Sequence, residues 1–526
     1  MSKIVSNQND NHLLVKLPFI LLAKIIKELD DNLDIICFSL VCKRWFDNRH
    51  SYLSFNCKDL MQLNRDCLNN ERDFTLNSYR DIFHRSLDHK SNCTLVITSN
   101  NEIQQAKSFL LCYDYILTIE NDIPESIINI YFTTWEIDAN FIEKLSQSNV
   151  YCINLTQSQH CPIESEFNSI RFPSNIKEIH LFCPFKPNLL PPELEKLEIQ
   201  TFSFSFDVSL LPRSLKSLKF VGSQVSIDLE ALPPFLEDLS YSIPNTEEPE
   251  TKRYPSSLKV LDVTVFQVKD FQYLTALHTL NLCVNDSASV DFQCGIPESV
   301  THLTISSAYS ITIRRENLPP NLKYLKLRDK VTFDQYTFSQ LEQLETLDIS
   351  GLLTDIGTNF QPLPSKIKKL CLPNYFFKMT NCKILPRSLE YLDVGGAYLS
   401  IKGAPKDSLK TLCIGQYTDI SHSRIPKSVE TIDFKERHLM MPPDMWPPSV
   451  KSILVTSKSE GNNHLKFLNI PKSITSITIR QTQGLGMKFL VRRLSDQSFL
   501  LLGINEFFLK ATFLNTKNYE NYFYGK

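Results

Sequence analysis

The sequence predicts an α/β solenoid, a parallel β array of short stacked repeats that follows a small N-terminal module of three helices. Two observations carry this prediction. A phrase reading Leu/Ile-Pro-x-Ser-Leu/Val/Ile, followed by x-x-Leu-x-apolar, recurs every 21 or 22 residues along most of the 526-residue chain. A compact helical pattern precedes the first repeat. A fixed period of this length indicates a solenoid, and solenoids usually provide binding surfaces.

The first folded element is expected at residues 17–45, which read LPFILLAKIIKELDDNLDIICFSLVCKRW. Apolar residues recur four apart, as at Leu21, Ile25 and Leu29, which predicts a helix with a broad apolar face. A second apolar run and a closing Cys-Lys-Arg-Trp sequence predict two more short helices. Three helices of this length cannot bury so many apolar side chains by themselves, so the pattern predicts a partner surface.

This segment resembles an F-box. The family pattern Leu-Pro-x-x-Leu-Leu-x-x-Ile-Leu-x-x-Leu begins at Leu17, and the pattern Asp-Leu-Leu-x-x-Ser-x-Val-Cys-Lys-x-Trp ends at Trp45. The chain departs from the family at Ile20, where Glu is common, and at Asp31, where Pro is frequent. The resemblance implies docking on the adaptor subunit of a ubiquitin ligase through eight residues: Leu17, Pro18, Leu21, Leu22, Ile25, Ile35, Val41 and Trp45. The alternative is an ordinary amphipathic helical cap on the solenoid.

One repeat, LPRSLKSLKF at residues 211–220, illustrates how each unit is expected to fold. Pro212 fixes its own φ and marks the turn before a strand, and Ser214 is expected to close that turn through a hydrogen bond. Alternate side chains of a strand face opposite sides, so Leu218 is expected in the core and Lys219 on the other face. Stacked copies then form a parallel sheet with one continuous apolar column.

The repeats resemble the FNIP-repeat family, a leucine-rich-repeat variant named after a Phe-Asn-Ile-Pro tetrapeptide. The resemblance rests on the recurring phrase Pro-x-Ser-[Leu/Val/Ile]-x-x-Leu and covers about residues 123–480. The literal tetrapeptide is absent, and the nearest match is Leu468-Asn469-Ile470-Pro471. The alternative is a different parallel β-solenoid with the same core column.

The domain organisation expected from these patterns has five parts. The parts are a disordered N-terminus at 1–12, the F-box at 13–50, a helical linker at 51–92, the leucine-rich-repeat-like solenoid at 93–480 and a C-terminal cap at 481–526. The Arg492-Arg493 pair in the cap is expected on a solvated face.

Composition argues against several classes of function. A net charge of −2 gives no basic footprint for nucleic acid or an anionic membrane. No signal peptide or membrane span is expected from the apolar pattern. Fourteen cysteines without a CxxC pair indicate a reduced, cytoplasmic or nuclear protein.

No catalytic residues, metal or cofactor are expected. The sequence holds no Gly-rich phosphate loop, HExxH, GxSxG or kinase signature. Two groups of candidate ligands match no standard zinc spacing, namely His84, His89 and Cys93, and Cys152, His160 and Cys161. The chain is therefore expected not to be an enzyme.

Together the two parts resemble the substrate receptor of a cullin–RING (SCF-type) ubiquitin ligase. The implied partners are the adaptor subunit, through it the cullin and RING subunits, and an unknown protein target. The alternative is a non-catalytic leucine-rich-repeat scaffold without a ubiquitin role.

The target site is expected on the inner sheet face, among side chains that alternate with the core. His302, Tyr324, Lys326 and Arg328 gather cations and aromatic rings there, a mixture suited to an acidic or phosphorylated segment. The alternative is that these residues form solvated strand faces. The positions between successive core residues, which we call the inner ladder, are Glu198, Lys219, Ser240, Asp262, Asn281, Thr304, Lys326, Asp348, Cys371, Asp393, Cys413 and Asp433.

Overall fold

One continuous sheet organises the molecule in the computed structural model. Within the described residues it contains 22 strands. The described residues are 13–29, 31–56, 73–88, 94–97, 115–132, 137–155, 171–181, 190–200, 207–242, 253–265, 270–285, 292, 294–353, 362–373, 385–395, 404–415, 418, 425–435, 446–457, 470–481, 488–504 and 509–515. Residues 1–12, expected to be disordered, lie outside them.

The first 19 strands pair in parallel, which confirms the predicted parallel β-solenoid. β2 lies beside β1, β1 joins β3, and from β3 onward each strand pairs with the next in sequence. The strands are β1 (Thr94–Ile97), β2 (Tyr115–Leu117), β3 (Asn129–Phe132), β4 (Cys152–Leu155), β5 (Glu178–Leu181), β6 (Lys196–Ile199), β7 (Ser217–Gln224), β8 (Asp238–Ser242), β9 (Val260–Val265), β10 (Thr279–Val284), β11 (His302–Ile313), β12 (Tyr324–Phe333), β13 (Thr346–Leu352), β14 (Lys369–Cys371), β15 (Tyr391–Asp393), β16 (Thr411–Cys413), β17 (Thr431–Asp433), β18 (Ser452–Ser457) and β19 (Ser476–Gln481).

The last three strands reverse direction. β20 (Lys488–Arg493) pairs antiparallel with β19, and β21 (Ser498–Ile504) and β22 (Leu509–Asn515) follow as antiparallel neighbours. Antiparallel strands need only short connections, so this part departs from the repeat pattern without leaving the sheet.

Many of the repeats enter their strand through a turn that begins at proline, whereas those before β10 and β13 turn at Leu274 and Leu341. The carbonyl of Pro212 accepts a hydrogen bond from the backbone N–H of Leu215 at 3.1 Å, and the next residues lead into β7. Leu218 is fully buried, as predicted, and Leu239 and Leu261 continue its column on β8 and β9. Burying a large aliphatic side chain contributes roughly 1.5–3 kcal/mol, so neighbouring repeats stabilise one another through this column.

The repeat serine does something other than the predicted closure of its own turn. The Ser214 hydroxyl donates to backbone carbonyls of the preceding repeat, those of Pro192 at 2.9 Å and Leu194 at 2.8 Å. Ser257 and Ser388 make the equivalent bonds in their repeats. The preceding turn lies within reach because the repeats stack at strand spacing, so the serine links neighbouring units.

In the described part of the chain the helices are few and short. The α-helices are α1 (Phe19–Lys27), α2 (Asn32–Ser39), α3 (Lys43–Asp47), α4 (Arg80–Asp88) and α6 (Ala139–Ser146). The 3-10 turns are η2 (Leu13–Lys16), η3 (Arg49–Ser51), η6 (Asn77–Tyr79), η8 (Val208–Leu210), η9 (Leu229–Ala231) and η10 (Arg315–Asn317). Among the described helices, none has the length and hydropathy needed to cross a bilayer.

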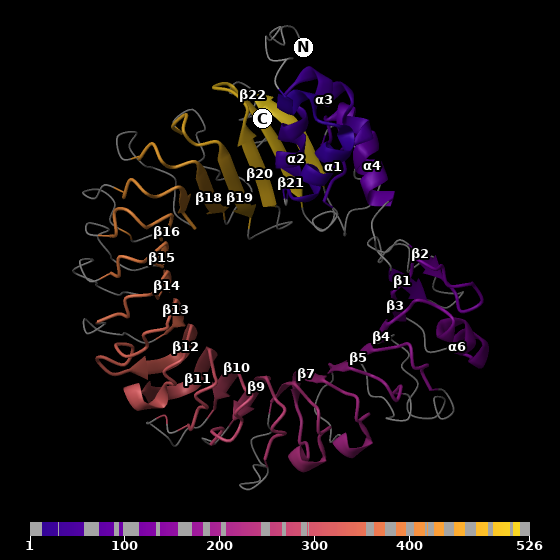
Figure 1. The fold of residues 1–526 in the computed structure, drawn as a ribbon, viewed down its shortest axis with the longest axis vertical. Coiled ribbons are helices and arrows are strands. Elements are labelled where there is room, and N and C mark those ends of the chain that lie inside the picture. The colour runs from indigo at the N-terminus through magenta and orange to yellow at the C-terminus, as the bar shows by residue number, and fades with distance from the viewer. Residues whose placement is uncertain are drawn as a thin grey trace.

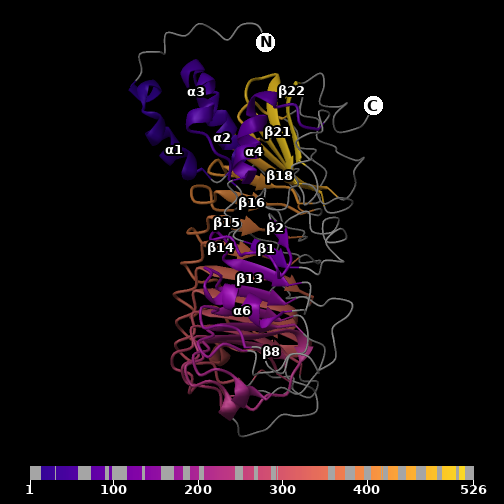
Figure 2. The same cartoon turned by 90° about the vertical axis from the view of Figure 1, so that its right-hand side faces the viewer.

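The chain closes into a ring. Figure 1 shows the strands following a circle that brings α1 to α4 beside β20, β21 and β22, and Figure 2 shows the same two ends together at one pole. The closing contact includes backbone hydrogen bonds, since the N–H of Thr75 donates to the carbonyl of Ala511 and the N–H of Ala511 to the carbonyl of Asp73, both at 2.9 Å. The core side of the sheet faces outward, where α6 packs, so the inner ladder faces the centre of the ring.

Candidate functional site

The N-terminal helices share one hydrophobic cluster with the C-terminal strands. Leu22 of α1 and Ile36 of α2 are fully buried in this cluster, together with Leu500 and Leu502 of β21. The partner surface predicted for the helices is therefore supplied in part by the chain itself. A three-helix module too small for its own core thus obtains one by closing the ring.

Trp45 is an internal anchor of this module. It is 5% exposed, its ring stacks on Phe38 with centroids 4.5 Å apart, and its indole N–H donates to the carbonyl of Val15 at 3.2 Å. The neighbouring Arg44 donates to the carbonyl of Leu17 at 3.1 Å. These bonds fix the segment that leads into α1 against α3.

A partly buried ion cluster joins the module to the cap. The Arg492 guanidinium on β20 donates to Asp34 at 2.7 Å, to Asp31 at 2.6 Å and to Ser476 at 2.8 Å. Only 17% of the Arg492 side chain is exposed, so the expectation that it lies on a solvated face is wrong. Asp31 also caps α2 by accepting the N–H of Leu33 at 2.8 Å.

An exposed apolar surface remains on the outside of the module. The exposed fractions are 69% for Ile20, 40% for Leu21 and 38% for Ile25 on α1, and 64% for Val41 in the turn after α2. Leu21 and Ile25 lie four residues apart, so they share one helix face. Ile20 was noted in the sequence only as a departure from the F-box pattern, although it adds to this surface.

The structure divides the eight predicted adaptor-binding residues. Their exposure to solvent differs because one side of the module packs on β20 to β22 and the other faces solvent. Four are exposed (Pro18, Leu21, Ile25 and Val41), Leu17 is half-buried, and Leu22, Ile35 and Trp45 are buried.

The inner ladder is in continuous register. Strand pairing places Glu198 beside Lys219, and the sequence of neighbours runs without a break to Cys413 and Asp433. The period-two alternation of the strands thus places one residue of each repeat in a single row. The row changes charge along its length, with acidic residues frequent toward β17.

The four predicted target-binding residues occupy adjacent strands. His302 stacks on Tyr324 with ring centroids 5.9 Å apart. The Lys326 ammonium bonds the Asp348 carboxylate at 2.9 Å, and this bond raises the pKa of Lys326. Arg328 is exposed on the same strand. The charge of Lys326 is therefore balanced by Asp348 on the inner face, and Arg328 is the more accessible cation.

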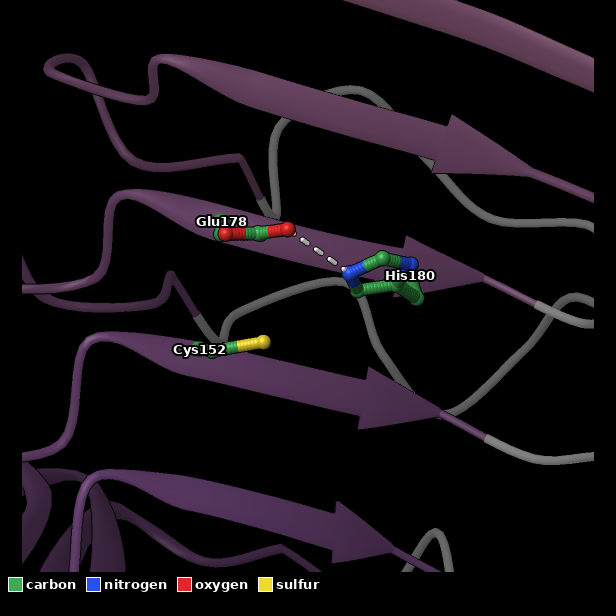
Figure 3. A group of neighbouring side chains, drawn as sticks. All are labelled: Cys152, Glu178 and His180. Carbon is green, nitrogen blue, oxygen red and sulfur yellow. Dashed lines mark hydrogen bonds and ion pairs between the residues drawn. The ribbon is translucent and has the colours of Figure 1, made fainter. Parts of the chain in front are cut away.

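A group of possible metal ligands lies where the sequence did not place one. Cys152 on β4 lies next to Glu178 and His180 on β5, as Figure 3 shows. Burial and the neighbouring Glu178 raise the pKa of the Cys152 thiol to about 12. Of the ligands weighed in the sequence, His160 and Cys161 lie outside the described residues, as do His89 and Cys93.

Comparisons with known proteins bear on the solenoid. The FNIP Repeat family model matches residues 293–330, a segment that includes β11. No curated protein matches the chain. The crystal structure of CroV588, a circular LRR protein, is 16% identical with a TM-score of 0.37 and a match over 71% of this chain. The match spans 56% of that protein's length. The chain is a parallel β-solenoid, and its residues 293–330 match the FNIP Repeat family model.

Proposed function

We propose that the protein is the substrate-recognition subunit of a cullin–RING ubiquitin ligase. The N-terminal helices act as an F-box that docks on the adaptor subunit, and the inner face of the ring binds the protein target. The ligase gains rate by holding the target near the ubiquitin-charged enzyme. In this proposal the chain carries out no chemistry itself.

The observation that supports adaptor docking is the exposed apolar surface of α1. A helical cap that only closed the ring would turn its apolar residues toward β20 to β22, as Leu22 and Ile26 do. Ile20, Leu21 and Ile25 instead face solvent. Contiguous apolar residues left exposed in this way mark interaction surfaces.

Adaptor binding is tested by the double variant Leu21→Asp/Ile25→Asp. Loss of one apolar contact at the centre of an interface costs about 1–2 kcal/mol of binding free energy. The double variant loses two such contacts, so its affinity for the purified adaptor should fall about 30- to 1,000-fold. Asp47→Lys, an exposed charge change on α3, is the control and should bind as wild type. Adaptor affinity unchanged in the folded double variant would rule out an F-box role. Trp45→Ala is unsuitable because it removes a buried anchor of the module.

Target binding by the inner face is tested separately. Arg328→Glu should reduce target recovery without changing adaptor affinity, because Arg328 is the exposed cation of the predicted site. The equivalent change at Lys330, exposed on the same strand, is the control. If the Arg328 and Lys330 variants recover equal amounts of target, the target binds elsewhere on the protein.

A second candidate is a scaffold without a ubiquitin role. The Arg492 cluster and the shared hydrophobic cluster favour this candidate, because through them α1 and α2 stabilise the closed ring. Purification of the full chain from cells distinguishes the two, since the scaffold should recover neither adaptor nor cullin.

A further inference from the structure

Three side chains from two neighbouring strands converge on the inner face near the start of the solenoid. Cys152 and Glu178 are direct partners in the β4–β5 register, and His180 lies two residues further along β5 on the same face. The Sγ, carboxylate oxygen and imidazole nitrogen lie within 4.8 Å of one another, and His180 Nε2 is 3.0 Å from Glu178 Oε1. In the part of the chain that the structure describes, this is the one place where three such donors gather.

We propose that Cys152, Glu178 and His180 form a binding site for a divalent transition-metal ion of the Zn²⁺ class. A thiolate, an imidazole and a carboxylate are the donors that Zn²⁺ takes, whereas Ca²⁺ and Mg²⁺ prefer oxygen alone. With bonds of about 2.0–2.3 Å, tetrahedral ligand atoms stand about 3.3–3.8 Å apart. The widest of the present separations, up to 4.8 Å, needs to shorten by at most about 1.5 Å to reach this spacing.

Each proposed ligand has a neighbouring polar group that would support it once an ion is bound. Asn154 Nδ2 donates to Cys152 Sγ at 3.7 Å, a contact that favours a thiolate. Glu198 Oε2 lies 3.3 Å from His180 Nδ1, so the imidazole can donate from Nδ1 and present Nε2 to the ion. Lys196 Nζ lies 3.6 Å from the second carboxylate oxygen of the glutamate ligand. Metal-bound histidines usually donate their other ring N–H in this way, and such partners tune metal affinity.

Ion pairs without a metal are the alternative explanation of this cluster. A protonated His180 between Glu178 and Glu198 would form a chain of ion pairs at 3.0 and 3.3 Å. Cys152 has no part in that chain, although it is 7% exposed and directed at the same point. Metal binding accounts for all three residues, and it exchanges the thiol proton for the ion, with the proton released to solvent.

The site is open toward the ring interior. Three protein ligands leave a fourth tetrahedral position for water or for a donor from a bound partner. Glu178, His180, Lys196 and Glu198 also line a groove of about 360 Å³ that continues to Asp238 on the same face. A bound ion would therefore lie in a surface that another molecule can reach.

The test uses Co²⁺ and Zn²⁺ with the full chain after chelator treatment. Co²⁺ should produce a thiolate-to-cobalt charge-transfer band, and Zn²⁺ should bleach it. Cys152→Ser should abolish the band, and Glu198→Gln should keep it while weakening Zn²⁺ binding about 10- to 100-fold. Cys413→Ser, at another buried inner-face cysteine, is the control and should match wild type.

His180→Gln provides a second, independent readout. It should lower the Zn²⁺ stoichiometry measured by calorimetry by one ion while leaving the circular dichroism spectrum unchanged. Wild-type stoichiometry and affinity in folded Cys152→Ser and His180→Gln proteins would overturn the site. Adaptor binding plays no part in these measurements, so they stand apart from the proposed ligase role.

Discussion

The Arg492 cluster makes the ring closure open to a direct test. Arg492→Met removes the guanidinium but keeps an apolar stem of similar length. Breaking a buried ion pair costs about 3–5 kcal/mol, and breaking an exposed pair costs about 0–1 kcal/mol. Asp34 is 46% exposed and Asp31 is 22% exposed, so the cluster lies between these limits. We expect a loss of about 2 kcal/mol in the free energy that holds the module on the cap.

Hydrogen exchange is the suitable assay, because a long solenoid does not unfold in one step. Amides of α2 and β20 should exchange about 30-fold faster in Arg492→Met, the rate change that corresponds to about 2 kcal/mol. Lys488→Met, an exposed change on the same strand, should leave them unchanged. In a double-mutant cycle with Asp34→Asn, we expect a coupling of about 1–2 kcal/mol. A coupling below about 0.3 kcal/mol would refute the view that this pair closes the ring.

Three further predictions concern the repeats. Ser388→Ala should destabilise its repeat by about 1 kcal/mol, because the hydroxyl links to the preceding turn, and unchanged amide exchange of β15 would contradict the link. Leu218→Ala should cost about 2–5 kcal/mol and Lys219→Ala under about 1 kcal/mol, and equal costs would contradict the strand register. Burial and nearby aspartates raise the pKa of Cys371 and of Cys413 to about 12. At pH 8 both thiols should therefore resist iodoacetamide in the folded protein and react after unfolding. The rate of alkylation in the folded protein should rise with pH. Rapid alkylation of both thiols at pH 8 in the native protein would show that they are exposed.

The parallel sheet and its register could be predicted because they follow from local rules. The proline turn sets where each strand begins, and the alternation of Leu218 and Lys219 sets which face each residue takes. The repeats before β10 and β13 lack the proline but keep the alternation, so the inner ladder followed from one unit. The serine bonds escaped prediction because they connect one repeat to the next, and a single repeat does not contain the acceptor.

The contacts of the two ends could not be predicted in the same way. Asp34 and Arg492 are 458 residues apart, and no sequence spacing marks two residues as partners over that distance. Cys152 and His180 belong to different repeats, so their proximity depends on the stacking register and not on a short motif. The apolar face of α1 was predicted, but its division into a buried and an exposed part depends on where the C-terminal strands lie.

Ring closure has a consequence for how the chain matures on the ribosome. At about 5–20 residues per second, synthesis of the 458 residues between Asp34 and Arg492 takes roughly 20–90 s. Throughout that interval α1 and α2 have been made without the strands that complete their core, so we expect them to need chaperone protection until β20 to β22 have been made. A chain truncated before β20 would leave the same apolar side chains uncovered. Synthesis of β20 to β22 therefore determines when α1 and α2 become stable, so a nascent chain or one shortened before β20 would lack the finished N-terminal surface.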